Sequence, residues 1–302
     1  MENELINKKG QTEQQFLEEY SKTKSQYEAP YVTTDNLIFT IGDDEAGNGK
    51  RLMLLLIKRE DHPYINQWAL PGGFIDIKEN LEATAERELA EETAVTGIYL
   101  EQLYTFGDVG RDPRHRIISA SYMALVNSKN MKVAAGDDAK DAKWFNVDSR
   151  IIEEKKTFTE KGFNKERLIK ISLNNGSEEA HGIIKTTKIV ENGRTKKITR
   201  EIVEKQNIAF DHAMIIEYGL QRLRNKIDYT DIIFNLLDEK FTWSELKTVY
   251  ELIKGEKRYK DANFRRKFED MIIETDEKAP VGGGKKGNRP PKLCMFNTDW
   301  EE

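Results

Sequence analysis

Short apolar runs separated by turn-rich loops are the clearest pattern in the first half of this chain. The run Leu52–Ile57 is typical of a buried strand, because six consecutive apolar residues suit a position between two packed layers. The preceding segment Gly42–Gly49 is rich in turn residues and predicts a loop. The strands that we predict here are Tyr31–Ile41, Leu52–Ile57, Tyr99–Phe106, Ile117–Val126 and Ala142–Phe145.

The segment Leu81–Thr93 has a different period and predicts a helix. Its residues Leu81, Ala85 and Leu89 recur at spacings of four and form one apolar row, and Asn80 before them is a good N-cap. Three carboxylates fall within one arc of the same helix, namely Glu88, Glu91 and Glu92. Like charges three and four residues apart destabilise an isolated helix, so a divalent cation with oxygen ligands is the obvious compensation.

The segment that follows the predicted strands is the hardest part of the chain to interpret. Alternating patterns occur in Arg167–Leu173 and His181–Val203, and the Asn192-Gly193 pair favours a type I′ turn. We therefore predict a β-hairpin insertion over residues 167–206. A helical pattern follows in Ala209–Lys226.

The C-terminal part changes to compact helical stretches. These are Tyr229–Leu237, Trp243–Ile253 and Ala262–Ile273, and Lys278–Phe296 follows with glycines Gly282–Gly287 at a hairpin tip. Three helices followed by a β-hairpin are the plan of a winged helix, a variant of the helix-turn-helix.

These patterns divide the 302 residues into three parts, as expected for a chain longer than one average domain. We predict a polar N-terminal segment with a helical pattern, an α/β domain and a winged-helix domain, over residues 1–30, 31–226 and 227–302. A chain that is 38% hydrophobic and 33% charged is typical of a globular protein with a well-solvated surface. It has no apolar run that could span a membrane and no signal peptide pattern, so we expect a cytoplasmic protein without membrane contact.

Two further features of the composition bear on function. The one cysteine, Cys294, excludes an internal disulfide and a multi-cysteine zinc site. The stretch Lys254–Lys292 holds twelve Lys/Arg against seven Asp/Glu, a net charge of +5, and leaves −10 for the rest of the chain. A basic C-terminal segment on an acidic body points weakly to a polyanionic partner.

The helix and the loop before it resemble the signature of the Nudix (MutT-type) hydrolases. In Gly73–Val95 a glycine is followed at the required spacings by Glu79, then Arg87-Glu88, then Glu91-Glu92. Every fixed position matches except the last glycine, which is Ala94 here. A solvated acidic helix is the alternative, but many specified positions agree in register. The resemblance implies a Nudix α/β/α sandwich with a mixed sheet.

What the resemblance implies about chemistry is hydrolysis of a nucleoside diphosphate linked to another group, with Mg²⁺ or Mn²⁺ as cofactor. The metal ligands that it implies are Glu88, Glu91 and Glu92. Glu79 is expected to support the metal site, and Arg87 to pair with Glu79 and fix the loop. Gly72 and Gly73 are expected to let the backbone approach metals and phosphates closely.

No general base can be identified in the sequence. One of the box glutamates is a candidate, and so are Asp137 and Asp138 by position, although a solvated turn explains this acidic pair as well. Trp68 could stack on a base, whereas a core tryptophan is the commoner outcome. The histidine of Phe210-Asp211-His212 is not expected to be catalytic.

The C-terminal part carries a second resemblance. Phe241–Leu246 (Phe-Thr-Trp-Ser-Glu-Leu) and Asn263–Phe268 (Asn-Phe-Arg-Arg-Lys-Phe) resemble the last domain of a Nudix subgroup. That subgroup contains ADP-ribose pyrophosphatase-like enzymes and Nudix-related transcriptional regulators of NAD metabolism, and it implies a homodimer. In it, a loop similar to Gly110–Arg114 lies near the substrate site. Arginines of such a loop can clamp phosphate oxygens, and a salt-bridged surface loop is the alternative. The candidates are Arg111, Arg114 and Arg116.

Two functions follow from these resemblances. The first is a metal-dependent pyrophosphohydrolase of ADP-ribose or a nucleoside-diphosphate sugar, favoured because all three metal-binding glutamates are present. The second is a nucleotide-sensing regulator whose winged helix binds DNA. Glu269 and Asp270 share the exposed face of the predicted recognition helix with Arg266 and partly cancel its charge, so we expect DNA binding to be weak and led by the basic hairpin tip. Its basic residues are Lys285, Lys286, Arg289 and Lys292.

Overall fold

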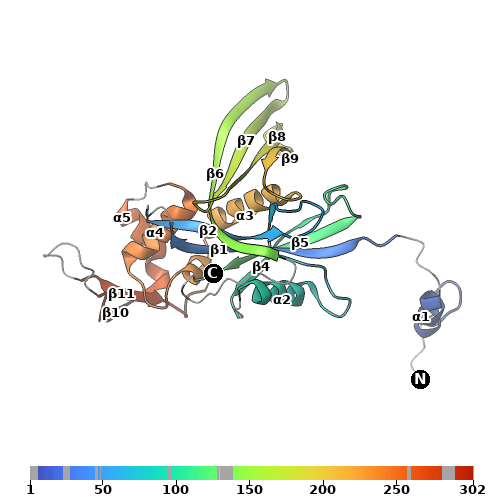
Figure 1. Ribbon diagram of the computed structural model, residues 1–302, viewed down its shortest axis with the longest axis horizontal. Coiled ribbons are helices and arrows are strands. Elements are labelled where there is room, and N and C mark those ends of the chain that lie inside the picture. The colour runs from blue at the N-terminus through green and yellow to red at the C-terminus, as the bar shows by residue number, and fades with distance from the viewer. Residues whose placement is uncertain are drawn as a thin grey trace.

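A computed structural model describes the chain over residues 6–22, 28–44, 47, 49–93, 97–127, 129, 139–256, 260–280 and 290–301. Three parts are visible in Figure 1: a central α/β layer structure, a long β extension that rises from it, and a helical domain at one side. The N-terminal helix α1 (Glu13–Lys22) lies inside the predicted polar segment and has no buried residue. No helix in the described ranges is long and apolar enough to cross a membrane.

The centre of the molecule is a nine-stranded mixed sheet with the order β4-β5-β1-β2-β6-β7-β8-β9, and β3 pairs with β2. The strands β1 and β5 are parallel, and the other neighbouring pairs are antiparallel. The strands are β1 (Tyr31–Asp43), β2 (Lys50–Arg59), β3 (Trp68–Ala69), β4 (Tyr99–Phe106), β5 (Ile117–Leu125), β6 (Ala139–Thr159), β7 (Gly162–Asn174), β8 (Glu179–Glu191) and β9 (Arg194–Gln206).

One helix covers each face of this sheet. Successive residues of β1 point to opposite faces, so Ile38 packs in a cluster with Leu89 of α2 (Leu81–Thr93), whereas Leu37 packs with Ile216 of α3 (His212–Lys226). Gly219 of α3 lies so close to Leu37 that a Cβ there would come within 2.4 Å of its side chain. The predicted α/β/α sandwich with a mixed sheet is confirmed.

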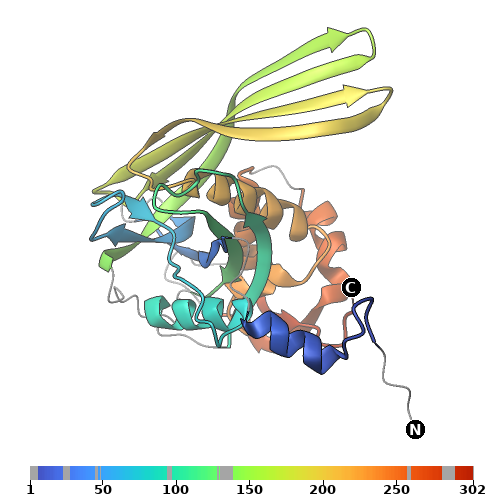
Figure 2. The same ribbon diagram turned by 90° about the vertical axis from the view of Figure 1, so that its right-hand side faces the viewer.

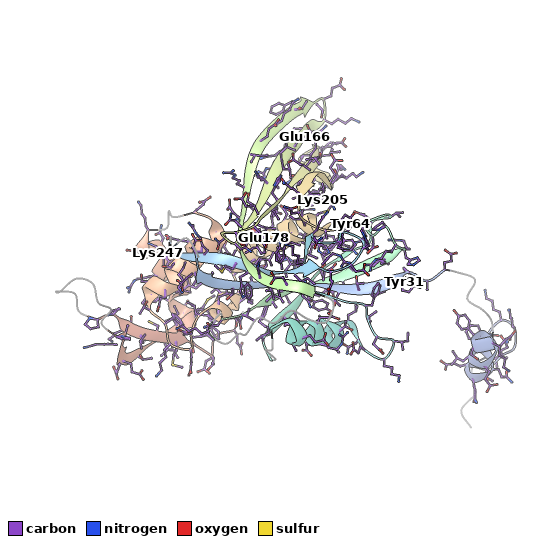
Figure 3. All side chains as sticks on the ribbon, in the orientation of Figure 1. Tyr31, Tyr64, Glu166, Glu178, Lys205 and Lys247 are labelled. Carbon is purple, nitrogen blue, oxygen red and sulfur yellow. The ribbon has the colours of Figure 1, made fainter. Side chains whose placement is uncertain are left out.

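The insertion differs from the single hairpin predicted over residues 167–206. It consists of two consecutive hairpins, β6–β7 and β8–β9, whose strands continue the central sheet (Figure 2). We call residues 150–206 the arm. The distal residues of the border strands β6 and β9 are exposed, and those of the inner strands β7 and β8 are largely half-buried. Cross-strand ion pairs join the strands, such as Lys185 with Glu166 at 2.7 Å; Glu166 is labelled in Figure 3. The apolar alternation marks the base of the arm, where Ile169, Ile171 and Leu173 are buried, and it is lost towards the tip, where charged residues occupy both faces.

The C-terminal domain has the winged-helix plan, with two corrections to its predicted helices. The predicted helix at residues 229–237 is only a 3₁₀ turn, η2 (Ile232–Leu236). The helix α4 (Trp243–Lys254) is as predicted, with a capping box at Thr242 and a left-handed Gly255. The helix predicted over 262–273 ends early, because α5 spans only Asp261–Phe268. It is followed by the 3₁₀ turn η3 (Glu269–Met271) and by the strands β10 (Ile272–Lys278) and β11 (Lys292–Phe296). Ile272 and Ile273 belong to β10, because they pair with Phe296 and Met295 of β11.

Candidate functional site

A cavity of about 920 Å³ opens between α2, the middle of β1 and the start of α3. It brings together residues from six separate parts of the sequence, which is how a small-molecule site is typically built. The lining includes Asp35, Gly72, Gly73, Phe74, Arg87, Glu88, Glu91, Arg111, Asp112, Arg114, Phe210 and His212.

The two glycines of the loop allow two close approaches inside this site. A Cβ on Gly72, which has φ 154°, would lie 2.0 Å from the carbonyl oxygen of Thr34. A Cβ on Gly73 would lie 2.2 Å from the carboxylate oxygen Oε1 of Glu88. A side chain at either position would therefore displace β1 or the carboxylate, and the glycines are required for packing within the protein itself.

Carboxylates of the helix α2 and of the loop before it surround the guanidinium of Arg87. Its Nε lies 3.2 Å from Oε1 of Glu79, and its Nη1 lies 2.9 Å from Oε1 of Glu88 and 3.3 Å from Oε1 of Glu91. The predicted pairing of Arg87 with Glu79 is thus present. The hydrogen bonds that Glu79 accepts from Arg87 and Thr84 lower the pKa of Glu79. The carboxylates of Glu79, Glu88 and Glu91 raise the pKa of Arg87. The arginine fixes the loop before α2 to the helix that follows it.

The donor set fits a hard divalent cation at the wall of the cavity. Glu88 and Glu91 both line it, and the missing side chain at Gly73 leaves room for the Glu88 carboxylate. Oxygen donors of this kind are what Mg²⁺ prefers. The side chain of Glu92, the third expected ligand, lies outside the described part of the chain. Among the described side chains, no group of three or more His, Cys, Asp or Glu is arranged to hold a metal.

A buried charge network forms the opposite wall. Arg111 donates to Asp211 through Nε at 2.9 Å and Nη2 at 2.8 Å, and to Asp35 through Nη2 at 3.2 Å. Only 5% of the Arg111 side chain is exposed, and Ser119 donates a further hydrogen bond to Asp35. Asp35 was not among the predicted site residues, although the polar run from Thr33 to Asn36 inside an otherwise apolar strand was a signal that could have found it.

His212 joins the same network as a neutral side chain. Its Nδ1 accepts the backbone N–H of Leu70 at 2.9 Å, and its Nε2 lies 3.6 Å from Asp35. Nδ1 therefore carries no proton, and burial lowers the pKa of His212 despite the nearby carboxylates Asp35 and Asp211. This histidine is a structural link between β3, β1 and α3.

The burial of His212 predicts a pH dependence of stability. Because the folded protein holds His212 neutral while the unfolded chain takes up a proton below pH 6.5, the free energy of unfolding should decrease as the pH falls below that value. The contribution is at most about 1.4 kcal/mol per pH unit. His212→Asn keeps an acceptor for Leu70 and removes the titration. In urea unfolding between pH 5 and 7, the free energy of unfolding should change less with pH in this variant than in the parent. An equal pH dependence in the two proteins would contradict the assignment.

The three arginines of the loop have different surroundings. Arg111 is held in the buried network, whereas Arg114 is 37% exposed, pairs with Asp112 and lies over the rings of Phe74 and Phe210. Arg116 is not part of the cavity lining as described, and it donates to the backbone carbonyls of Gly107 and Asp108. Arg114 is thus the arginine placed to meet a ligand.

Two other predicted candidates fall elsewhere. Trp68 is buried in the core and makes an edge contact with Phe145, with ring centroids 4.7 Å apart, so it is not a stacking platform. The residues Asp137 and Asp138, considered as general bases, lie outside the described residues.

Two family descriptions match this chain. Residues 39–163 match the NUDIX domain, and residues 233–296 match the NrtR DNA-binding winged helix domain. The ADPR responsive transcriptional repressor NtrR of Acinetobacter baylyi is 29% identical over 287 residues, which cover 94% of this chain and 88% of that protein. The ADP-ribose pyrophosphatase of Methanocaldococcus jannaschii is 38% identical over 96 residues, 32% of this chain and 56% of that enzyme.

Solved structures show the same arrangement over nearly the whole length. A MutT/nudix family protein from Enterococcus faecalis has 25% identity and a TM-score of 0.65, covering 95% of this chain and 94% of its own. NrtR of Shewanella oneidensis has 28% identity and a TM-score of 0.57, and the match covers 88% of this chain and 94% of NrtR. The complex of that NrtR with a 27mer DNA has 26% identity and a TM-score of 0.55, and the match covers 88% of this chain and 93% of that chain. The chain therefore consists of a Nudix domain followed by an NrtR-type winged-helix domain.

Proposed function

We propose that the protein is a ligand-responsive DNA-binding regulator. The Nudix domain binds a nucleoside diphosphate such as ADP-ribose, the winged helix binds DNA, and the ligand changes the affinity for DNA. The similarity to an ADP-ribose-responsive repressor extends over 94% of the chain, whereas the similarity to a pyrophosphatase covers 32% of it. The sequence favoured the pyrophosphohydrolase over the regulator, and the longer match to the repressor favours the regulator instead.

The observation that carries the proposal is the position of α3, which joins the cavity to the winged helix. Its N-terminal residues Asp211 and His212 belong to the buried network at the cavity. At its other end, Arg224 donates to the carbonyl of Ile253 in α4 at 3.0 Å, and Lys254 donates back to the carbonyl of Arg224 at 2.6 Å. A ligand that alters the contacts of Asp211 would therefore act on an element that holds the DNA-binding domain.

The cavity suits a ligand with phosphates and a ring. Its volume lies in the range of about 300–1,000 Å³ that small-molecule sites have. Arg114 offers a partly exposed guanidinium, and the side chain of Phe74 is near it and exposed. Guanidinium groups bind phosphate oxygens bidentately, and aromatic faces stack on planar rings.

A mobility-shift titration tests the proposal directly. DNA from upstream of the protein's own gene should be shifted by the full chain, a scrambled duplex of equal length should not, and ADP-ribose should change the apparent affinity for the first. Equal binding to both duplexes, or binding that ADP-ribose leaves unchanged at saturation, would contradict the regulator.

Arg114 provides a test of the ligand site. Arg114→Ala should weaken ADP-ribose binding by about 1.5–3 kcal/mol, because one charge-assisted contact to phosphate is lost. Arg116→Ala is the matched control, since this side chain contacts only backbone carbonyls of its own loop among the described residues. Calorimetric titration of both variants gives the comparison. Equal affinities in the two variants would assign the phosphate contact to another residue.

Metal-dependent hydrolysis is a second candidate, favoured by the complete set of box glutamates. Glu88 and Glu91 would hold the cation together with Glu92, and the cation would neutralise a bound diphosphate and lower the pKa of a water. The residues described here would bind and orient the substrate: Arg114 at the phosphates, and Arg87 by fixing the loop that carries Gly73.

The metal site predicts a stability effect that does not depend on turnover. Mg²⁺ or Mn²⁺ should raise the free energy of unfolding by mass action, about 2.7 kcal/mol at a concentration of 100 Kd. Glu88→Gln should remove most of this gain, and also any hydrolysis of ADP-ribose. Glu86→Gln is the control, because Glu86 is an exposed glutamate of the same helix outside the cavity lining. Thermal unfolding at increasing metal concentration measures the stabilisation of both variants. If the metal stabilises Glu88→Gln as much as the parent, the metal site is refuted.

A further inference from the structure

The far end of the arm is a basic surface to which the proposed function gives no role. Residues 155–165 and 186–197, which we call the outer arm, hold eight Lys/Arg against two Asp/Glu, a net charge of +6, whereas the whole chain carries −5. Figure 2 shows this part extending beyond the body of the protein. A cluster of one charge on a projecting element is the electrostatic footprint of an oppositely charged partner.

Three lysines of the arm lie in a single row across neighbouring strands. Lys156 of β6 is opposite Lys165 of β7, and Lys165 is opposite Lys188 of β8. The register between these strands is unbroken at and around the three positions, and directly opposed residues point to the same face of a sheet. The three side chains, which we call the lysine row, therefore share one face.

The lysine row lies on the face that carries α3 at the base of the arm. Lys188 has the same parity as Gly182 on β8, and a Cβ at Gly182 would come within 2.5 Å of Ala213 in α3. Lys165 likewise has the same parity as Ile171, which is fully buried in the core beneath that helix. This face is thus covered by α3 near the body and is open further out (Figure 1).

The opposite face of the same strands is electrically balanced. Over the stretch that pairs with residues 153–158 of β6, it holds three basic and three acidic residues, namely Lys155, Lys185, Lys197, Glu153, Glu166 and Glu201. Lys185 and Glu166 form an ion pair at 2.7 Å. Charge in the arm is therefore sorted by face, which solubility alone does not require.

Acidic side chains offset little of the lysine row. Glu154 lies on the same face and pairs with Lys165 at 2.9 Å and with Arg167 at 2.7 Å, so two cations share one carboxylate. Lys156 and Lys188 are exposed and form no ion pair within the described residues. The row therefore keeps an excess of positive charge.

The row lowers the stability of the arm when nothing is bound to it. Neighbouring strands are about 4.8 Å apart, and like charges that are directly opposed across them destabilise the sheet. Lys156 is also held over the rings of Phe158 and Phe163, with its Nζ 4.8 and 4.0 Å from their centroids, which fixes its ammonium group on this face. A bound polyanion would remove the repulsion.

We propose that the lysine row binds the phosphate backbone of duplex DNA independently of base sequence. The choice of duplex DNA rests on the proposed function, because the winged-helix domain would bring this polyanion near the arm. Duplex DNA carries one negative charge per about 1.7 Å of its axis, and lysines that contact phosphates add affinity without reading bases. The winged helix then selects the sequence, and the arm strengthens binding to any sequence.

Charge reversal on the two faces tests the surface. At low salt, Lys188→Glu should weaken binding to the upstream and scrambled duplexes by the same factor, on the order of tenfold, and should reduce the slope of log affinity against log salt by about one. Lys197→Glu is the matched control, because it makes the same change of charge at an exposed lysine on the balanced face. Its affinity for both duplexes should stay within about twofold of the parent. Fluorescence anisotropy at two salt concentrations gives the comparison.

Thermal unfolding shows whether Lys188→Glu acts through the surface or through misfolding. The new glutamate would lie opposite Lys165, so a repulsive pair becomes an attractive one and Tm should rise by about 2 °C. Lys197 is opposite Ile189, and its replacement has no such pair to form. A Tm of Lys188→Glu below that of Lys197→Glu would contradict the repulsive row.

The outcomes separate this proposal from the regulator. If Lys188→Glu binds both duplexes as tightly as Lys197→Glu does, the row does not contact DNA, even where ADP-ribose still changes the affinity for upstream DNA. If Lys188→Glu loses affinity for both duplexes while ADP-ribose has no effect on the parent, the row is supported and the regulator is not. Unchanged DNA binding together with lost binding to vesicles of anionic phospholipid would assign the row to a membrane surface and overturn the proposal.

Discussion

Replacing Arg111 by alanine is expected to lower the free energy of unfolding by about 3–5 kcal/mol. The guanidinium bridges Asp35 of β1 and Asp211 at the start of α3, and the three side chains are 5%, 12% and 13% exposed. Its removal leaves two carboxylates close together in a buried site without a positive partner. The loss is therefore larger than the coulombic value of one ion pair.

The measurement is urea unfolding at pH 7, with Arg116→Ala as the matched control. Arg116 belongs to the same loop and donates only to the carbonyls of Gly107 and Asp108 in the described chain, so its loss should cost about 0.5 kcal/mol or less. Equal midpoints for the two variants would show that the network contributes nothing to stability.

The parts of the fold that local sequence determines were predicted well. The helix Leu81–Thr93 has the predicted bounds, because its N-cap, its apolar row and its acidic arc are all encoded within thirteen residues. The central strands β1, β2, β4 and β5 also lie where their apolar runs indicated. The ligand-site glycines and the Arg87–Glu79 pair followed from the same short motif.

The rest depends on contacts between distant residues. Asp35 and Arg111 are 76 positions apart, and Arg111 and Asp211 are 100 apart, so no local pattern relates them. The arm was underestimated because its strands are stabilised by their neighbours: Glu154 of β6 pairs with Lys165 and Arg167 of β7, which one strand's sequence cannot show. The three loop arginines looked equivalent and have three different environments.

The end of α5 changes the expectation for DNA binding. Glu269 and Asp270 were expected beside Arg266 on the exposed face of the recognition helix, but they lie in the 3₁₀ turn η3 after α5 has ended at Phe268. Within α5, Asp261 pairs with Lys247 of α4, and Lys267 pairs with Asp228. The helix is therefore not neutralised internally as predicted. Three residues of the basic hairpin tip, Lys285, Lys286 and Arg289, lie outside the described residues.

Arg266→Ala is accordingly expected to weaken DNA binding by about 1–3 kcal/mol. Arg266 is exposed on α5, while the neighbouring Arg265 lies over the ring of Trp243. Its removal should also reduce the slope of log affinity against log salt by about one if it contacts a phosphate, and relax sequence preference if it contacts a base. ADP-ribose binding should be unchanged, because α5 takes no part in the cavity lining as described.

Lys50→Ala is the control for this experiment, since Lys50 is an exposed lysine of β2 that pairs with Asp43. The double variant Lys285→Glu with Lys286→Glu tests the expectation from the sequence, in which the hairpin tip leads. Fluorescence anisotropy at two salt concentrations compares all of them on one duplex. If the tip variant loses DNA binding while Arg266→Ala retains the parental affinity and salt slope, the helix is not the reading element and binding is led by the hairpin. If Arg266→Ala has the larger effect and alters the preference between upstream and scrambled DNA, α5 is the element that reads the sequence.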